Sequence, residues 1–174
     1  DNWQKQVRMY VTTSYHSISY LMMVLTNLNG KKFTATHMTF GAIHEMEAAQ
    51  GYRRLIALAD HPVLSYIING IIREESVHAQ FYRSVARIEL ERNEFAQKMA
   101  RWVIEHFWAP VGQGSLAKER TEYTIATLFA ADNAIEGLDR TVTQRIRQLP
   151  GFDGITKITD TIGEMAGNSV MKFE

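Results

Sequence analysis

The sequence predicts an all-α protein whose helices form an antiparallel bundle. Apolar residues recur at intervals of three and four along most of the 174 residues, which is the period of an α-helix with one buried face. The alternation typical of a strand is not sustained, even in the Ile- and Thr-rich region 155–162, and only residues 33–39 are otherwise compatible with extended structure. Long helices with short connections favour antiparallel neighbours, so we expect one bundled domain over residues 1–174.

Turn and proline signals separate the helices. An Asn-Gly pair at 29–30 closes the first one. Pro62 ends the second helix and suits the first turn of the third, whereas Pro110 and Pro150 follow the fourth and fifth. The expected helices span residues 3–27, 36–59, 63–91, 94–108, 115–148 and 155–165.

Composition excludes several classes of protein. The chain has no cysteine, which rules out disulfides, zinc knuckles and thiol catalysis and agrees with a cytoplasmic location. Nineteen basic residues balance nineteen acidic ones, so no net charge suggests nucleic acid. No apolar run approaches the ~20 residues of a membrane span, and no signal-peptide pattern is present.

One acidic residue interrupts the apolar face of the predicted helix 36–59. Counting by threes and fours from Met38 to Ile56 gives a stripe that is apolar except for Glu45. Glu47 lies off this stripe beside polar neighbours, so we expect it to be solvated.

The predicted helix 63–91 carries a matching interruption. Glu75 and His78 lie three positions apart on its apolar stripe, on adjacent turns of one face. An unpaired carboxylate is costly to bury, so these groups must be neutralised, paired or bound to a metal. Glu75 and His78 could pair with each other or with an arginine. Glu45, from the neighbouring helix, favours a metal site, and this ligand set suits non-haem iron or manganese.

Three segments carry a resemblance to a known family. Residues 43–45 (Ile-His-Glu), 60–63 (Asp-His-Pro-Val) and 73–83 (Arg-Glu-Glu-Ser-Val-His-Ala-Gln-Phe-Tyr-Arg) resemble acyl-carrier-protein desaturases, especially the actinobacterial ones. The likeness extends weakly through residues 107–114 and covers roughly residues 38–160. These enzymes are ferritin-like helical bundles, and the resemblance therefore implies a ferritin-like fold.

The resemblance also implies roles and partners. Glu45 and His78 would each bind iron, and Glu75 would bridge two irons. Glu74 would orient a histidine from outside the ligand sphere, as metal-bound imidazoles require. The implied reaction reduces oxygen at the two irons and removes hydrogen from an acyl chain on acyl carrier protein. Ferredoxin or a similar donor would supply electrons, and the enzyme would be a homodimer.

The chain departs from the family pattern in three ways. It has no second Glu-x-x-His, and no acidic residue lies between Asn2 and His44. His16 is the only possible ligand in that region, with a threonine rather than a glutamate three residues before it. Ala48 stands where the family has an oxygen-handling threonine, and Tyr52 where it has a histidine just outside the ligand sphere.

Several explanations of these departures stay open. An upstream segment carries the missing ligands, a homodimer builds one site from two copies, or the protein is a relative that has lost its metal. Three functions also stay open: a desaturase, a metal-free scaffold, and a related oxygenase that hydroxylates or N-oxygenates another tethered substrate, which the departures at Ala48 and Tyr52 allow.

Charged residues elsewhere have two interpretations. A basic stretch could dock an acidic carrier protein or be ordinary helix surface; it comprises Arg83, Arg87, Arg92, Lys98 and Arg101, with Arg145, Arg147 and Lys157 as an extension. Asp132, Glu136 and Asp139 could replace missing ligands, but a solvated face is the simpler interpretation.

Overall fold

The computed structural model describes residues 31–113, 116–131 and 133–170. The predicted helix 3–27 and His16 lie outside this part of the chain. Among the described residues all named elements are helical, which confirms the predicted all-α bundle. The elements are α3 (Lys31–Ala59), α4 (Pro62–Glu91), α5 (Glu94–Phe107), α6 (Lys118–Phe129), α7 (Ala134–Leu138), the π-helix η1 (Asp139–Thr143), α8 (Gln144–Arg147) and α9 (Lys157–Val170).

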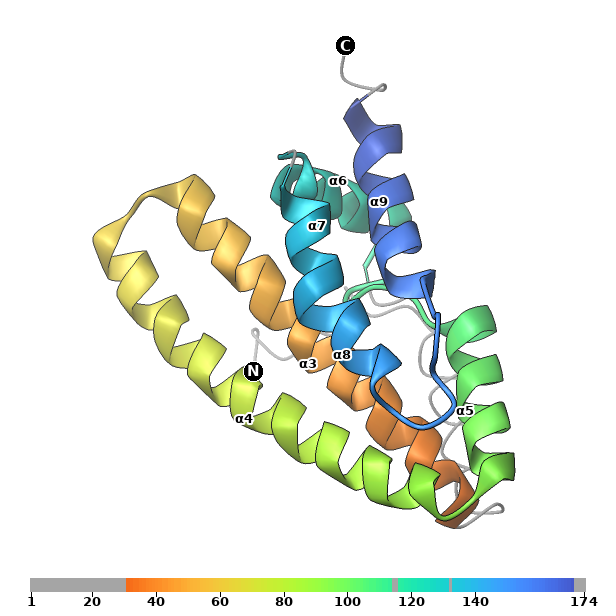
Figure 1. The fold of residues 1–174 in the computed structure, drawn as a ribbon. Coiled ribbons are helices and arrows are strands. Elements are labelled where there is room, and N and C mark those ends of the chain that lie inside the picture. The colour runs from red at the N-terminus through yellow and green to blue at the C-terminus, as the bar shows by residue number, and fades with distance from the viewer. Residues whose placement is uncertain (1–30, 114–115, 132, 171–174) are drawn as a thin grey trace, which may run out of the picture.

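Helices α3 and α4 form a long antiparallel pair (Figure 1). The reversal takes only two residues, because Asp60 adopts a left-handed conformation with φ 42°. His61 caps α4 by accepting a hydrogen bond from the Leu64 N–H at 3.3 Å, and Pro62 occupies the first turn. The predicted boundary at Pro62 is therefore confirmed.

Helix α3 lies at the centre of the bundle. It contacts α4, α5, α6, α7 and η1, and Figure 1 shows α4 on one side of α3 and α6 and α9 on the other. Residues 33–39 belong to α3, and Phe33, Ala35 and Thr39 are buried, so the extended alternative is wrong. Residues 33–39 have only a weak local preference for helix, and their burial against the rest of the bundle explains why they are helical.

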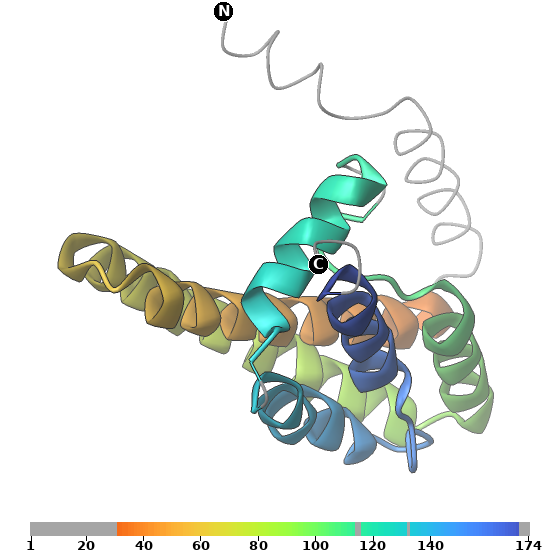
Figure 2. The same cartoon turned by 90° about the horizontal axis from the view of Figure 1, so that it is seen from above.

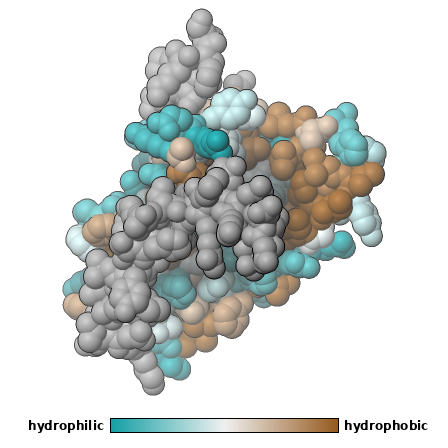
Figure 3. All heavy atoms as spheres, turned by 180° about the vertical axis from the view of Figure 1, so that it is seen from behind, coloured by the Kyte–Doolittle hydropathy of each residue, from teal (hydrophilic) through white to brown (hydrophobic). Residues whose placement is uncertain are grey.

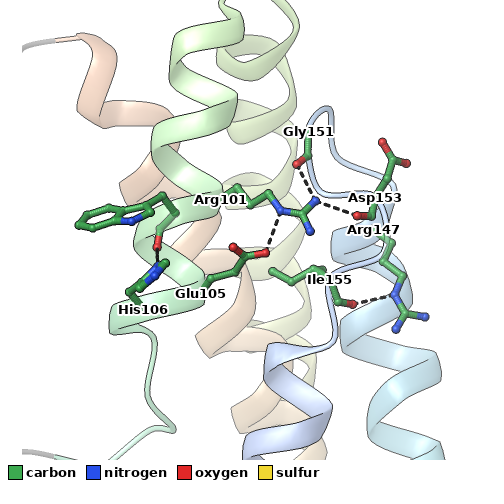
Figure 4. Close-up of polar contacts among 8 residues, drawn as sticks. Arg101, Glu105, His106, Arg147, Gly151, Asp153 and Ile155 are labelled. Atoms are coloured by element: carbon green, nitrogen blue, oxygen red, sulfur yellow. Dashed lines mark hydrogen bonds and ion pairs between the residues drawn. The ribbon is translucent and has the colours of Figure 1, made fainter.

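The loop between α8 and α9 is held by arginines (Figure 4). Arg101 of α5 donates hydrogen bonds to the carbonyls of Gly151 at 3.2 Å and Asp153 at 2.7 Å. Arg147 donates to the Ile155 carbonyl at 2.8 Å. Beneath these contacts Phe152 is fully buried, so the loop forms part of the core.

The predicted single helix 115–148 is wrong. α6 ends at Phe129, and after a short connection the chain continues as α7, η1 and α8 in a different direction (Figure 2). Phe129 and Ala134, on either side of the connection, are both buried. The bend lets α6 pack on α9 and α3 while η1 also reaches α3, which one straight helix would not permit. Within the described residues, no helix is long and apolar enough to span a membrane.

Candidate metal centre

Glu45, Glu75 and His78 come together on one flank of the α3–α4 pair. Each offers one ligand atom, and these atoms all lie within 4.8 Å of one another. The two carboxylates are half-buried, whereas the His78 side chain is 56% exposed. The cluster therefore opens outward at His78 and is closed on the side of the two helices.

Small residues bring the two helices together at this point. Ala42 and Ala49 on α3 and Ala79 on α4 are buried in their contact, and small side chains permit a close interhelical approach. Gly41 lies one turn before Glu45, and the ring of Tyr82 occupies the space above it: a Cβ at Gly41 would lie 2.8 Å from Tyr82 Cδ1. Gly41 precedes Glu45 by one turn and Tyr82 follows His78 by one turn, so this contact belongs to the same antiparallel register that brings Glu45 beside His78.

The three groups are electrostatically coupled. Burial, a hydrogen bond to Glu75 and charge repulsion from Glu75 together raise the pKa of Glu45 to about 7, although the charge of His78 opposes the shift. His78 Nδ1 lies 3.3 Å from Glu75 Oε2. Two carboxyl groups that share a proton beside an imidazole form a site where a cation can replace that proton.

The donor set fits a transition metal. Two carboxylates and an imidazole are typical of non-haem iron and manganese, and a cation with metal–ligand bonds of about 2.1 Å would join the three atoms after small side-chain movements. A ferritin-like di-iron site uses two such sets: a Glu from each of two helices and a Glu-x-x-His from each of two more. The described residues provide one set.

The other residues predicted around the site lie outside the cluster. Glu74 is exposed on α4, and Tyr52 is half-buried two turns after Glu45 on α3. Ala48 lies one turn after Glu45 and is also half-buried. The orienting role of Glu74 and the place of Tyr52 just outside the ligand sphere stay predictions.

Glu47 is buried, so the prediction that it is solvated is wrong. It is 6% exposed, and its Oε1 and Oε2 accept from the Val111 N–H at 3.1 and 3.3 Å. Burial raises the pKa of Glu47 to about 8, and the Val111 hydrogen bond only partly offsets this. The periodicity of the sequence indicates one buried face, that of Glu45, but α3 is central and buries a second one. The series Ile43, Glu47, Gln50 was the signal for it.

Two further polar groups have structural roles. His44 lies between Phe40 and Trp108, and its Nε2 is 3.1 Å from the Ala109 carbonyl. Burial lowers its pKa, which favours the neutral ring. Asp139 accepts hydrogen bonds from Thr159 and Gln144 and lies 3.7 Å from Arg147. These bonds occupy the Asp139 carboxylate, which lies outside the cluster of Glu45, Glu75 and His78.

Comparison of the chain with protein-family models, with curated proteins and with solved structures gives no match.

Proposed function

We propose that Glu45, Glu75 and His78 are one half of a carboxylate-bridged di-iron centre, and that the protein is an O2-dependent oxidoreductase of the acyl-carrier-protein desaturase type. The observation that supports this most is the convergence of three ligand atoms from two helices to within 4.8 Å. The sequence resemblance supports the nature of the metal and of the substrate, an acyl chain tethered to acyl carrier protein.

Each ligand has a distinct place in the proposal. Glu75 is flanked by both other groups, since it hydrogen-bonds Glu45 and pairs with His78, which suits a carboxylate that bridges two irons. His78 binds one iron through its ring, and Glu45 closes the site from α3. The irons, when bound, would supply the reduction of oxygen that drives removal of hydrogen from the acyl chain.

The second half of the centre is proposed to come from a second copy of the chain. Two copies contribute four carboxylates and two imidazoles, which is the ligand set of a ferritin-like di-iron site. The exposed flank of His78 is compatible with this arrangement. Apolar side chains are also exposed on the α3–α4 pair, among them Leu55, Ile67 and Phe81. Figure 3 shows a broad apolar surface where the two helices meet at their turn, and such patches mark protein interfaces.

Iron binding tests the proposal directly. The full chain is loaded with iron(II) under argon, exposed to air and desalted, and its iron content and oligomeric state are measured. We expect about one iron per chain in a dimer, and His78→Ala to weaken binding about 10-fold or more. Glu75→Ala should abolish binding. Glu91→Ala, an exposed glutamate at the end of the same helix, is the matched control and should bind normally. Less than ~0.2 iron per wild-type chain would refute the metal site.

Product analysis then tests the reaction. Loaded protein is incubated with acyl-carrier-protein substrates, ferredoxin and its reductase, and the acyl chain is analysed by mass spectrometry. Loss of two hydrogens indicates desaturation, whereas gain of an oxygen indicates the related oxygenase. Binding of the carrier protein should weaken with salt, because exposed charges are screened.

A metal-free scaffold is the second candidate. The number of metal ligands favours it, since the described residues supply only one of the two ligand sets that a di-iron site needs. In that case Glu75 and His78 are only a partly exposed ion pair of small energetic value. Normal folding of the Glu75→Ala variant, together with absence of iron from the wild type, would support it.

A further inference from the structure

A second candidate site lies on the opposite flank of the α3–α4 pair. A cavity of about 690 Å³, open to solvent on one side, is lined by α3, α4 and the α7–η1–α8 segment. Four arginines line it: Arg53 from α3, Arg83 from α4, Arg140 from η1 and Arg145 from α8. On α4 the cavity is lined by residues such as Ala79, Gln80 and Arg83, and Glu45, Glu75 and His78 are not among its lining residues. The cavity and the proposed metal centre therefore share no residue.

The positive charge in this cavity is not neutralised by the residues around it. None of the described residues that line it is acidic. The side chains of Arg53, Arg140 and Arg145 are exposed, and none of them forms a hydrogen bond or ion pair with another described residue. Asp139, the acidic neighbour of Arg140, is already bonded to Thr159 and Gln144.

Arg83 is the most constrained of the four. Its Nη2 donates to Gln148 Oε1 at 2.7 Å, and its Nε is buried without a hydrogen-bond partner among the described residues. Desolvation, together with repulsion from Arg87 and Arg145, lowers its pKa. Like charges held together in this way are stabilised when an anion binds between them.

The local backbone supports a binding role. Arg140 projects from η1, a single π-helical turn, and such turns are frequent at functional sites. Thr141 in the same turn accepts from Gln50 of α3 and donates to the Gly137 carbonyl at 2.6 Å. These bonds tie η1 to α3, so the wall that carries Arg140 is held in place before a ligand arrives.

We propose that this cavity binds a small organic phosphate, through the guanidinium groups of Arg53, Arg83, Arg140 and Arg145. Guanidinium groups match phosphate oxygens in pairs, and four of them suit a diphosphate or two separate phosphate groups. The volume lies in the range of small-molecule sites, about 300–1,000 Å³.

The remaining lining residues restrict the rest of the ligand. No aromatic side chain is among them, and most are small or polar, including Gln50, Ser76, Gln80 and Thr141. A nucleotide base would find no ring to stack on. A phosphorylated sugar or polyol, whose hydroxyls can bond to amide and hydroxyl groups, fits this lining better.

Calorimetric titration of the full, metal-free chain with inorganic pyrophosphate tests whether the four arginines bind phosphate groups. We expect saturable binding at one site per chain. Arg83→Gln and Arg145→Gln should each raise the Kd about 10-fold or more, because each removes charge-assisted hydrogen bonds. Arg145→Lys should recover only part of the affinity, since it restores charge without the paired donors. A hexose bisphosphate should bind at least as well as pyrophosphate, and ATP should gain nothing over it.

Matched control variants distinguish a specific binding site from nonspecific electrostatic attraction of pyrophosphate to the protein. Arg92→Gln removes an exposed arginine that follows α4 and does not line the cavity, so it should leave the Kd within about 2-fold. Glu75→Ala should also bind pyrophosphate normally, because it alters only the proposed metal centre. Circular dichroism verifies that each variant is folded. Absence of binding at millimolar pyrophosphate, equal losses in Arg92→Gln, or equal affinity for citrate would overturn the proposal.

Discussion

Replacement of Glu47 by glutamine tests the burial of this carboxylate on α3. The side chain is 6% exposed and its only hydrogen-bond donor among the described residues is the Val111 N–H. Glutamine has nearly the same shape, and its Oε1 can keep the bond to Val111. Glu47→Gln therefore removes the ionisable group and leaves the packing in place.

The stability that Glu47→Gln is expected to gain over the wild type depends on pH. Burial raises the pKa of Glu47 from its ordinary 4.5 to about 8. Between these values the unfolded chain ionises while the folded chain keeps its proton, so the folded state binds more protons and loses stability as pH rises. The loss is about 1.4 kcal/mol per pH unit. From pH 5 to pH 8 the loss of unfolding free energy is on the order of 4 kcal/mol. This loss should not occur in Glu47→Gln, which has no ionisable group at this position.

Urea denaturation at pH 5, 6.5 and 8 measures this effect. The free energy of unfolding of Glu47→Gln relative to wild type should increase with pH across the series. Glu91→Gln, which changes an exposed glutamate on α4, should show a constant difference. A pH-independent difference for Glu47→Gln would mean that the carboxylate is solvated or already paired, and the reasoning from burial would be wrong.

Three further experiments test other parts of the structure. Gly151→Ala should lower the free energy of unfolding by about 2–4 kcal/mol, because Gly151 has φ +83° and a Cβ would lie 2.6 Å from Gln97 Cβ. Gly154→Ala, with φ +70° and open space around it, should cost only about 1 kcal/mol; equal losses would argue against the Gln97 contact. Arg101→Gln should cost about 1–3 kcal/mol and speed amide exchange in the loop after α8, since it removes bonds to two carbonyls; unchanged exchange would contradict this. Manganese affinity should fall as pH drops below about 7, where a proton occupies Glu45. If equilibrium dialysis gives the same affinity from pH 5.5 to 7.5, Glu45 is not a ligand.

The sequence was sufficient to predict the convergence of Glu45, Glu75 and His78. Their positions on amphipathic stripes, with Pro62 marking the reversal between two helices, implied that the three side chains meet across an antiparallel pair. The structure places their ligand atoms within 4.8 Å of one another. Whether they hold iron stays a prediction, because no structural observation beyond their geometry tests it.

The second buried face of α3 and the arginine-lined cavity were not predicted. Of the four arginines, only Arg83 and Arg145 belong to the basic stretch that the sequence offers as a docking surface, and nothing in the sequence joins them to Arg53 and Arg140. Both features depend on which distant segments pack on α3. Glu47 meets Val111 across 64 positions of sequence, and Gln50 meets Thr141 across 91. Periodicity within a helix cannot show that such partners exist.

The sequence by itself determined the class of secondary structure, the ends of α4 and α5 and the residues of the candidate metal centre. These follow from local chemistry: the period of the helix, the missing N–H of proline and the spacing of side chains on one face. Only the tertiary structure decided the burial of Glu47, the bend after Phe129 and the gathering of four arginines from four elements. Those features are set by packing between segments far apart in the chain, where burial of apolar side chains from several helices outweighs local preference.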